Sequence, residues 1–153
     1  MRNQKKLILE QLDRKLEPLK GAEIIQMPTK GWIHSIRTAL NMTLLQLGSR
    51  LNITKQGARK LEESESSESI TIRSLKEIGN ALDMKFVYGF IPKTGSFEKM
   101  VEQKSRQLAT KIVLRTNQNM LLEDQGNSKD QIELAIHELT LEIKREMRRS
   151  IWD

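Results

Sequence analysis

The sequence of 153 residues contains no cysteine, which excludes disulfides and thiolate metal sites. Aromatic residues are also few, with two Trp, one Tyr and three Phe. Because apolar residues make up 37% of the chain, we expect a modest core built mainly from aliphatic side chains. The length suits one compact domain or a small domain with helical extensions.

Long apolar runs are absent as well, since none reaches the roughly 20 residues that a membrane-spanning helix needs. The first twenty residues are charged throughout, unlike a secretion signal, so we expect a cytoplasmic protein with no membrane partner. No catalytic constellation or phosphate loop is recognisable, and neither an enzyme nor a cofactor is predicted. The only histidines, His34 and His137, lack a second ligand at metal spacing, so no metal site is predicted.

Positive charge is in excess but is spread along the chain. The net charge of +6 and the pI near 9.7 favour a polyanionic partner, although solubility alone would also account for them. Residues 1–30 contain seven bases against four acids, residues 31–83 seven against six, and residues 84–153 twelve against ten. Affinity for a polyanion would therefore depend on how the folded chain arranges its basic residues and not on a basic segment of the sequence.

The segment TLLQLGSRLNITKQGARKLEE, residues 43–63, predicts two short helices joined by a tight turn. Thr43 is a good N-cap, and the leucines after it recur at helical spacing. Asn52 tolerates the left-handed conformation that a sharp turn needs, and Thr54 is a second N-cap. The second helix should therefore begin at about Lys55.

This second helix combines a core-facing side with an outward side rich in hydrogen-bond donors, as a helix that reads the major groove requires. Gln56 can pair with adenine and Arg59 with guanine or phosphate, whereas Gly57 would let the backbone approach the groove. The alternative interpretation is an ordinary charged surface helix with no binding role. The predicted DNA-binding residues are Thr54, Lys55, Gln56, Gly57, Arg59 and Lys60.

A wider stretch, IRTALNMTLLQLGSRLNITKQGARKLE, resembles the phage-repressor-like (Cro/C1, or XRE) helix-turn-helix family. The matching positions include Arg37, Thr43, Gly48 and the terminal pair Leu61 and Glu62. The resemblance implies double-stranded DNA as a partner and a homodimer, because bacterial repressors with this domain are generally dimeric. In this chain, ESESSESI stands where the family usually has a Gly-x-x-x-Pro turn.

Nearly the whole chain resembles the family called mobile mystery protein A, through GWIHSIRTALNM, LEESESSESITIRSL, ALDMKFVYGFIP, NMLLEDQ and the terminal IWD. That family is found beside a Fic-domain partner, which implies an autorepressor or antitoxin-like role. The alternative is direct inhibition of a Fic-type toxin by protein contact. Fic enzymes are commonly inhibited by a helix in which Glu precedes Gly or Asn, and no Glu here does so.

We therefore predict a mainly α fold, with a Cro/C1-type core, helical extensions at both ends and one or two short β-strands. The predicted regions are an N-terminal helix and linker (1–30), a helix-turn-helix domain (31–83), a strand and linker (84–94) and a C-terminal helical region (95–153).

Three further expectations concern segments around the helix-turn-helix motif. The strand KFVYGFI, residues 85–91, should pair with AEIIQM or, preferably, with a second subunit, because a single strand is not stable alone. SESSES is expected to be a solvated loop. The C-terminal helices are expected at 96–116 and 128–151, joined by NQNMLLEDQGN.

Overall fold

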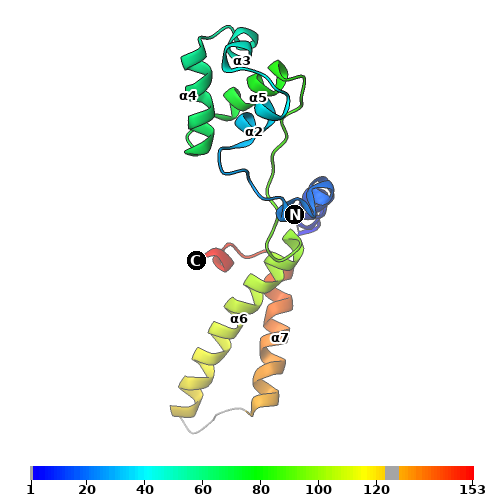
Figure 1. Cartoon of the computed structure of the whole chain (residues 1–153). Helices are drawn as coiled ribbons and strands as arrows, with labels where there is room; N and C mark the ends of the chain where they lie inside the picture. Colours follow the sequence, from blue (N-terminus) through cyan, green and yellow to red (C-terminus); the bar gives the residue numbers. More distant parts are fainter. Residues whose placement is uncertain (1, 123–127) are drawn as a thin grey trace. The chain divides into compact units, whose positions relative to one another are not determined.

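The computed structural model of the chain describes residues 2–122 and 128–153, and within them the chain is mainly helical (Figure 1). It divides into two compact units. Unit 2 is the continuous segment Gly21–Gly89, and unit 1 combines Met1–Lys20 with Phe90–Asp153. The amphipathic N-terminal helix therefore belongs to the same unit as the C-terminal helices.

Unit 2 consists of short helices whose starts are fixed by threonine caps. Thr43, Thr54 and Thr71 each accept a hydrogen bond from a backbone N–H in the first turn of the helix that follows. Each cap satisfies one of the backbone donors that a helix start leaves without a partner. The helical elements are η2 (Ala22–Ile24), α2 (Trp32–Ala39), α3 (Leu44–Leu51), α4 (Lys55–Ser66) and α5 (Ile72–Ala81).

The core of unit 2 is aliphatic, as its composition predicts. Each of α2 to α5 contributes at least one apolar side chain that faces the others, and Leu47 and Ala58 are completely buried. At about 25 cal/mol for each Å² of apolar surface removed from water, such a cluster is the main stabilising term of a small domain. The buried core residues are Ile33, Leu47, Ala58, Ile78 and Leu82.

Unit 1 is built on a long helical hairpin with the N-terminal helix packed against it. Asp13 of the N-terminal helix accepts hydrogen bonds from the backbone N–H of Phe97, at 2.7 Å, and of Glu98, at 3.3 Å. It thereby caps the first helix of the hairpin from a distant part of the sequence. The elements are α1 (Arg2–Leu16), η1 (Glu17–Leu19), α6 (Phe97–Leu122), α7 (Lys129–Glu146) and η3 (Arg149–Trp152).

The core of unit 1 lies between α6 and α7 and is closed at one end by η3. Residues on α6 at intervals of four, Val101, Ser105 and Ala109, are buried against the apolar face of α7. Small side chains at these positions allow the two helices to pack closely. The buried apolar residues are Val101, Ala109, Ile136, Ile143 and Ile151.

The predicted strand is not formed within the chain. Residues 85–91 have no helix or strand assignment, and no strand occurs among residues 2–122 and 128–153. Pairing with AEIIQM was wrong, because Ala22–Ile24 forms a 3-10 helix in which the Ile25 N–H bonds the carbonyl of Ala22. A strand needs a neighbour for its backbone groups, and the described part of the chain places none beside this segment. Pairing with a second subunit stays a prediction.

Several helix boundaries also differ from the sequence prediction. α4 runs through Ser64, Glu65 and Ser66, so half of SESSES is helical and only its end is a turn. α6 continues to Leu122, beyond the expected end at residue 116, whereas α7 stops at Glu146 because Met147 adopts the left-handed conformation, with φ of 52°. The rest of the expected connection, residues 123–127, lies outside the described residues.

Candidate nucleic-acid interface

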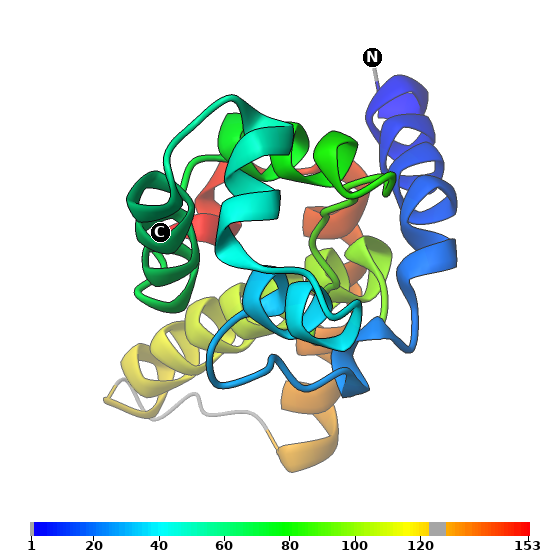
Figure 2. The ribbon, with the colours of Figure 1, turned by 45° about the horizontal axis from the view of Figure 1, so that its top comes forward.

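The turn between α3 and α4 has the conformation that its sequence predicts (Figures 1 and 2). Asn52 is left-handed, with φ of 57°, and the N–H of Ile53 bonds the carbonyl of Gly48 at 2.9 Å. A Cβ atom on Gly48 would lie 2.8 Å from the carbonyl oxygen of Ile53, so a larger residue would push the turn away. The close approach of the two helices therefore depends on glycine at this position.

Both helices are capped at their N-terminal ends. Thr43 and Gln46 form a reciprocal capping box, with hydrogen bonds of 3.1 and 2.8 Å between side chain and backbone. Thr54 Oγ1 accepts a hydrogen bond from the Gly57 N–H at 3.0 Å. These caps place the start of α4 at Lys55, as predicted.

The first two turns of α4 bring the predicted DNA-binding residues together on one part of the surface. Lys55, Gln56, Arg59 and Lys60 are exposed, and none of them has a hydrogen bond or an ion pair with another described residue. Ala58, between them, is completely buried and anchors the helix to the core. The outward donors are therefore free to contact a ligand while the backbone that carries them is held in place.

Two of the six predicted residues also have a role inside the protein. The Thr54 side chain is occupied by the cap, which leaves its hydroxyl proton for an external acceptor. Gly57 is half-buried, and a Cβ atom there would lie 3.4 Å from the Cβ of Ile53. This is ordinary van der Waals distance, so the internal role of Gly57 is that its backbone N–H donates to the Thr54 cap.

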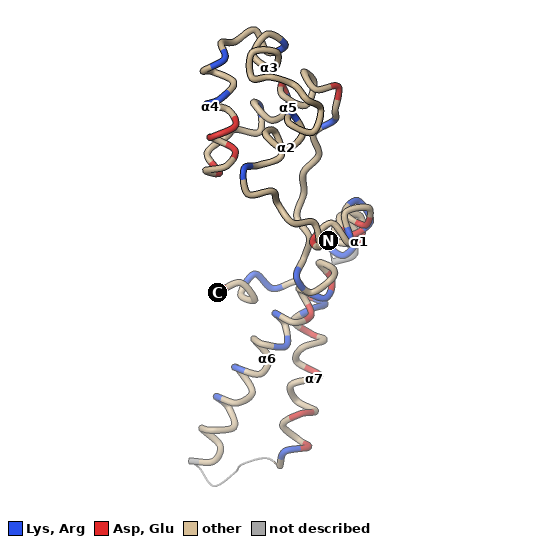
Figure 3. The backbone as a smooth tube through the Cα atoms, viewed as in Figure 1, with Lys and Arg blue, Asp and Glu red and all other residues tan. Residues whose placement is uncertain are grey.

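The charged residues of α4 are segregated by sign, with bases in the first half of the helix and acids in the second half (Figure 3). Glu62 lies on the inner side of the helix, where it binds Arg37 through both carboxylate oxygens. The Nδ1 atom of His34 lies 3.1 Å from Glu62 Oε2. Glu62 thus lies within α4 and ties this helix to α2.

Burial raises the pKa of the Glu62 carboxyl, but hydrogen bonds from Arg37 and His34 and the positive charge of Arg37 outweigh burial, so the pKa lies below its ordinary value. Arg37 also donates from Nη1 to the carbonyl of Met42 at 2.8 Å, which fixes the end of α2. Arg37 and Glu62 are both less than one-tenth exposed, and each supplies the charged partner of the other. The pair is consequently a structural clamp rather than a surface ion pair.

A second acidic residue of α4 is also used internally. Glu65 Oε1 accepts a hydrogen bond from the Ile33 N–H at 2.8 Å, at the start of α2. A Cβ atom on Gly31 would collide with this carboxylate, at 2.5 Å. Sequence reasoning missed this contact because it joins residues more than thirty positions apart. With Glu62 and Glu65 both committed to α2, the outward charge of α4 is set mainly by its basic half.

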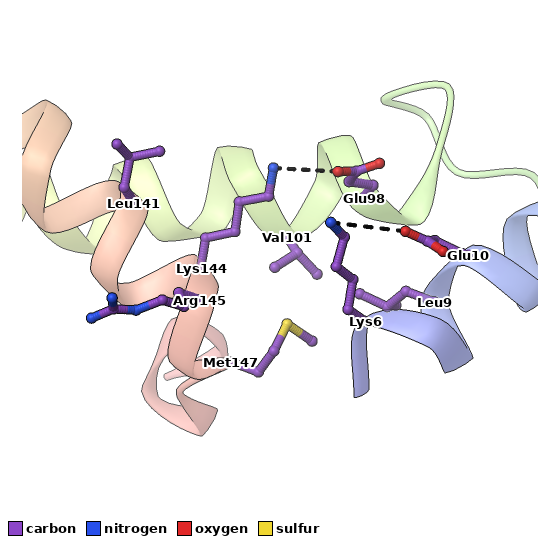
Figure 4. A pocket seen from close by; sticks show the side chains of 9 residues that line it. All are labelled: Lys6, Leu9, Glu10, Glu98, Val101, Leu141, Lys144, Arg145 and Met147. Carbon is purple, nitrogen blue, oxygen red and sulfur yellow. Dashed lines mark ion pairs between the residues drawn. The ribbon is translucent and has the colours of Figure 1, made fainter. Parts of the chain in front are cut away.

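Unit 1 contains a cavity of about 250 Å³ between α1, α6 and α7 (Figure 4). Leu9, Val101 and Met147 form part of its apolar wall. Four of its charged residues form ion pairs: Lys144 lies 3.5 Å from Glu98, and Lys6 lies 3.9 Å from Glu10.

Comparison with known proteins returns no match among protein-family models, curated proteins or solved structures. In the described parts of the chain, no group of three or more His, Asp or Glu side chains is placed to hold a metal ion. The helices of residues 2–122 and 128–153 include none long and apolar enough to cross a membrane.

Proposed function

We propose that this protein is a sequence-specific DNA-binding transcriptional regulator that reads the major groove with the first half of α4. The observation that carries the proposal is the capped α3–turn–α4 unit, which presents four unpaired donor side chains on a buried anchor. Arg59 and Gln56 have the side chains best suited to base edges, and Lys55 and Lys60 suit phosphates. This arrangement agrees with the resemblance to Cro/C1-type repressors.

The proposal includes a homodimer that represses its own operon. Paired major-groove readers bind half-sites about one helical turn, roughly 34 Å, apart. Residues 85–91, whose Val87, Tyr88 and Phe90 are exposed, offer an unpaired segment to a second copy. Sedimentation that found a stable monomer at micromolar concentration would remove this part of the proposal.

The decisive experiment is a footprint on the DNA upstream of the protein's own gene. Replacing Gln56 and Arg59 together by Ala should weaken specific binding by about 2 to 5 kcal/mol, because both base contacts are lost while the buried side of α4 is unchanged. The matched control replaces Gln103 and Arg145, exposed residues of the same types in unit 1, by Ala. Wild-type footprinting by the α4 double variant would refute the assignment.

A second candidate is an antitoxin that inhibits a Fic-type toxin by direct contact, as the resemblance to mobile mystery protein A suggests. The observation in its favour is the exposed apolar surface of unit 1, where Leu134, Leu141 and Trp152 are each more than half exposed. Co-purification of the two proteins without DNA, lost on replacing Leu134 and Leu141 by Gln, would favour this candidate. Normal DNA binding by that variant would show that the two roles use different surfaces.

A further inference from the structure

α6 has a long stretch without negative charge. After Glu102 it contains no acidic residue through Leu122, although acids and bases are nearly balanced over residues 84–153 as a whole. Figure 3 shows the resulting contrast, with basic residues along this part of α6 and acidic residues along α7. An acid-free run of this length on one helix creates a local positive field that the rest of the unit lacks.

Three of the four bases in this run fall on one face of the helix, and Arg106 lies off it. Lys104, Lys111 and Arg115 are spaced seven and four residues apart, which places them in one row. Gln107 and Gln118 continue the row and add further donors. At a rise of 1.5 Å per residue, the three cations span about 16 Å along α6.

The three cations of this row, here called the α6 basic row, lack ion pairs with any part of the chain that the structure describes. Two bases that lie on the same hairpin are paired instead: Arg106 with Glu133 at 3.2 Å, and Lys144 with Glu98 and Glu102. Lys111 and Arg115, four residues apart, repel each other on the helix surface. The row thus has a small stability cost that an external anion would offset.

The row matches a phosphate backbone better than a compact anion. It is a line of single charges and amide donors on a helix, with Lys111, Arg115, Gln107 and Gln118 exposed. Regularly spaced phosphates can engage several such side chains at once, and each contact releases condensed counterions. Side chains of this kind position a protein on DNA without reading its sequence.

We infer that the α6 basic row is a second DNA-contacting surface, in unit 1, that binds the phosphate backbone of duplex DNA. This inference rests on the proposed function, because it adds sequence-independent affinity to the specific contacts of α4. It assigns affinity and salt dependence to unit 1 and base recognition to unit 2.

The test measures the salt dependence of binding for the full-length protein. The row variant carries Lys104→Gln, Lys111→Gln and Arg115→Gln, and the duplex is one that the wild type footprints. The control variant carries Lys99→Gln, Lys129→Gln and Arg145→Gln, which removes the same charge from other positions of α6 and α7. Glutamine retains good helix propensity, and circular dichroism verifies that both variants are folded.

In the row variant, the slope of log Kobs against log salt should become shallower by about 2 to 3. Each lost phosphate contact removes about 0.9 from the magnitude of this slope. In the control variant, the magnitude of the slope should fall by less than about 1. The footprint should keep its position in both variants. A charge-conserving variant, Lys111→Arg with Arg115→Lys, should retain the wild-type slope.

An unchanged slope in the row variant, or an equal change in both variants, would overturn this inference and leave the α4 assignment intact. Failure of the wild type to bind any duplex would overturn both. If the row variant kept its DNA slope but lost binding to polyglutamate, the row would belong to an acidic protein partner and the inference would be wrong.

Discussion

The two units hold charged side chains together in different ways. In unit 2, Arg37 and Glu62 are both nearly buried and form a clamp between α2 and α4. In unit 1, Lys144 lies between Glu98 and Glu102 on a partly exposed surface, at 3.5 and 3.0 Å. A buried pair leaves an unmatched charge when one partner is removed, whereas water replaces a lost partner at the surface. Short capped helices thus depend on internal polar contacts more than the long hairpin does.

The largest effect should come from removing one side of the buried pair. Arg37→Met leaves the Glu62 carboxylate without its main partner, and we expect the free energy of unfolding of unit 2 to fall by about 3 to 5 kcal/mol. Lys144→Met in unit 1 should cost no more than about 1 kcal/mol. Amide hydrogen exchange of α2 to α5 and of α6 and α7 measures the two effects separately. Equal losses of unfolding free energy in the two variants would show that the two units do not differ in their dependence on ion pairs.

A smaller effect is expected from the helix caps, which both units use. Thr54→Ala and Ser128→Ala each remove a side-chain acceptor at the start of a helix, at α4 and α7 respectively. Each should cost about 1 kcal/mol, because one backbone donor loses its partner. Denaturant unfolding with Thr54→Ser and Ser128→Thr as cap-preserving controls would measure this. A much larger loss for Thr54→Ala would mean that the turn as a whole depends on its cap.

The smallest effect should be the pH dependence that the clamp gives to unit 2. Because the folded-state pKa of Glu62 is below its ordinary value near 4.5, its contribution is present above that pH and is lost as the pH falls through the lowered pKa. The difference in stability between wild type and Glu62→Gln should therefore shrink on acidification below about pH 4.5. A difference that stayed constant from pH 6 to pH 3 would show that Glu62 does not titrate as inferred.

Sequence reasoning located the local features of unit 2 well, since they depend on neighbouring residues. Thr43, Asn52 and Thr54 cap or turn the backbone through their own side chains and conformations, and each does so in the structure. The start of α4 and the exposure of its donors follow directly from them.

The sequence by itself determined the helical class, the aliphatic core positions and the capped turn before Lys55, because helical periodicity and capping act over a few residues. Tertiary structure alone decided which acids of α4 face inward, since Glu62 meets Arg37 and Glu65 meets Ile33 only after the chain folds back on itself. It also decided that residues 85–91 form no strand with any other described residue. These outcomes depend on contacts between distant residues, which local pattern does not specify.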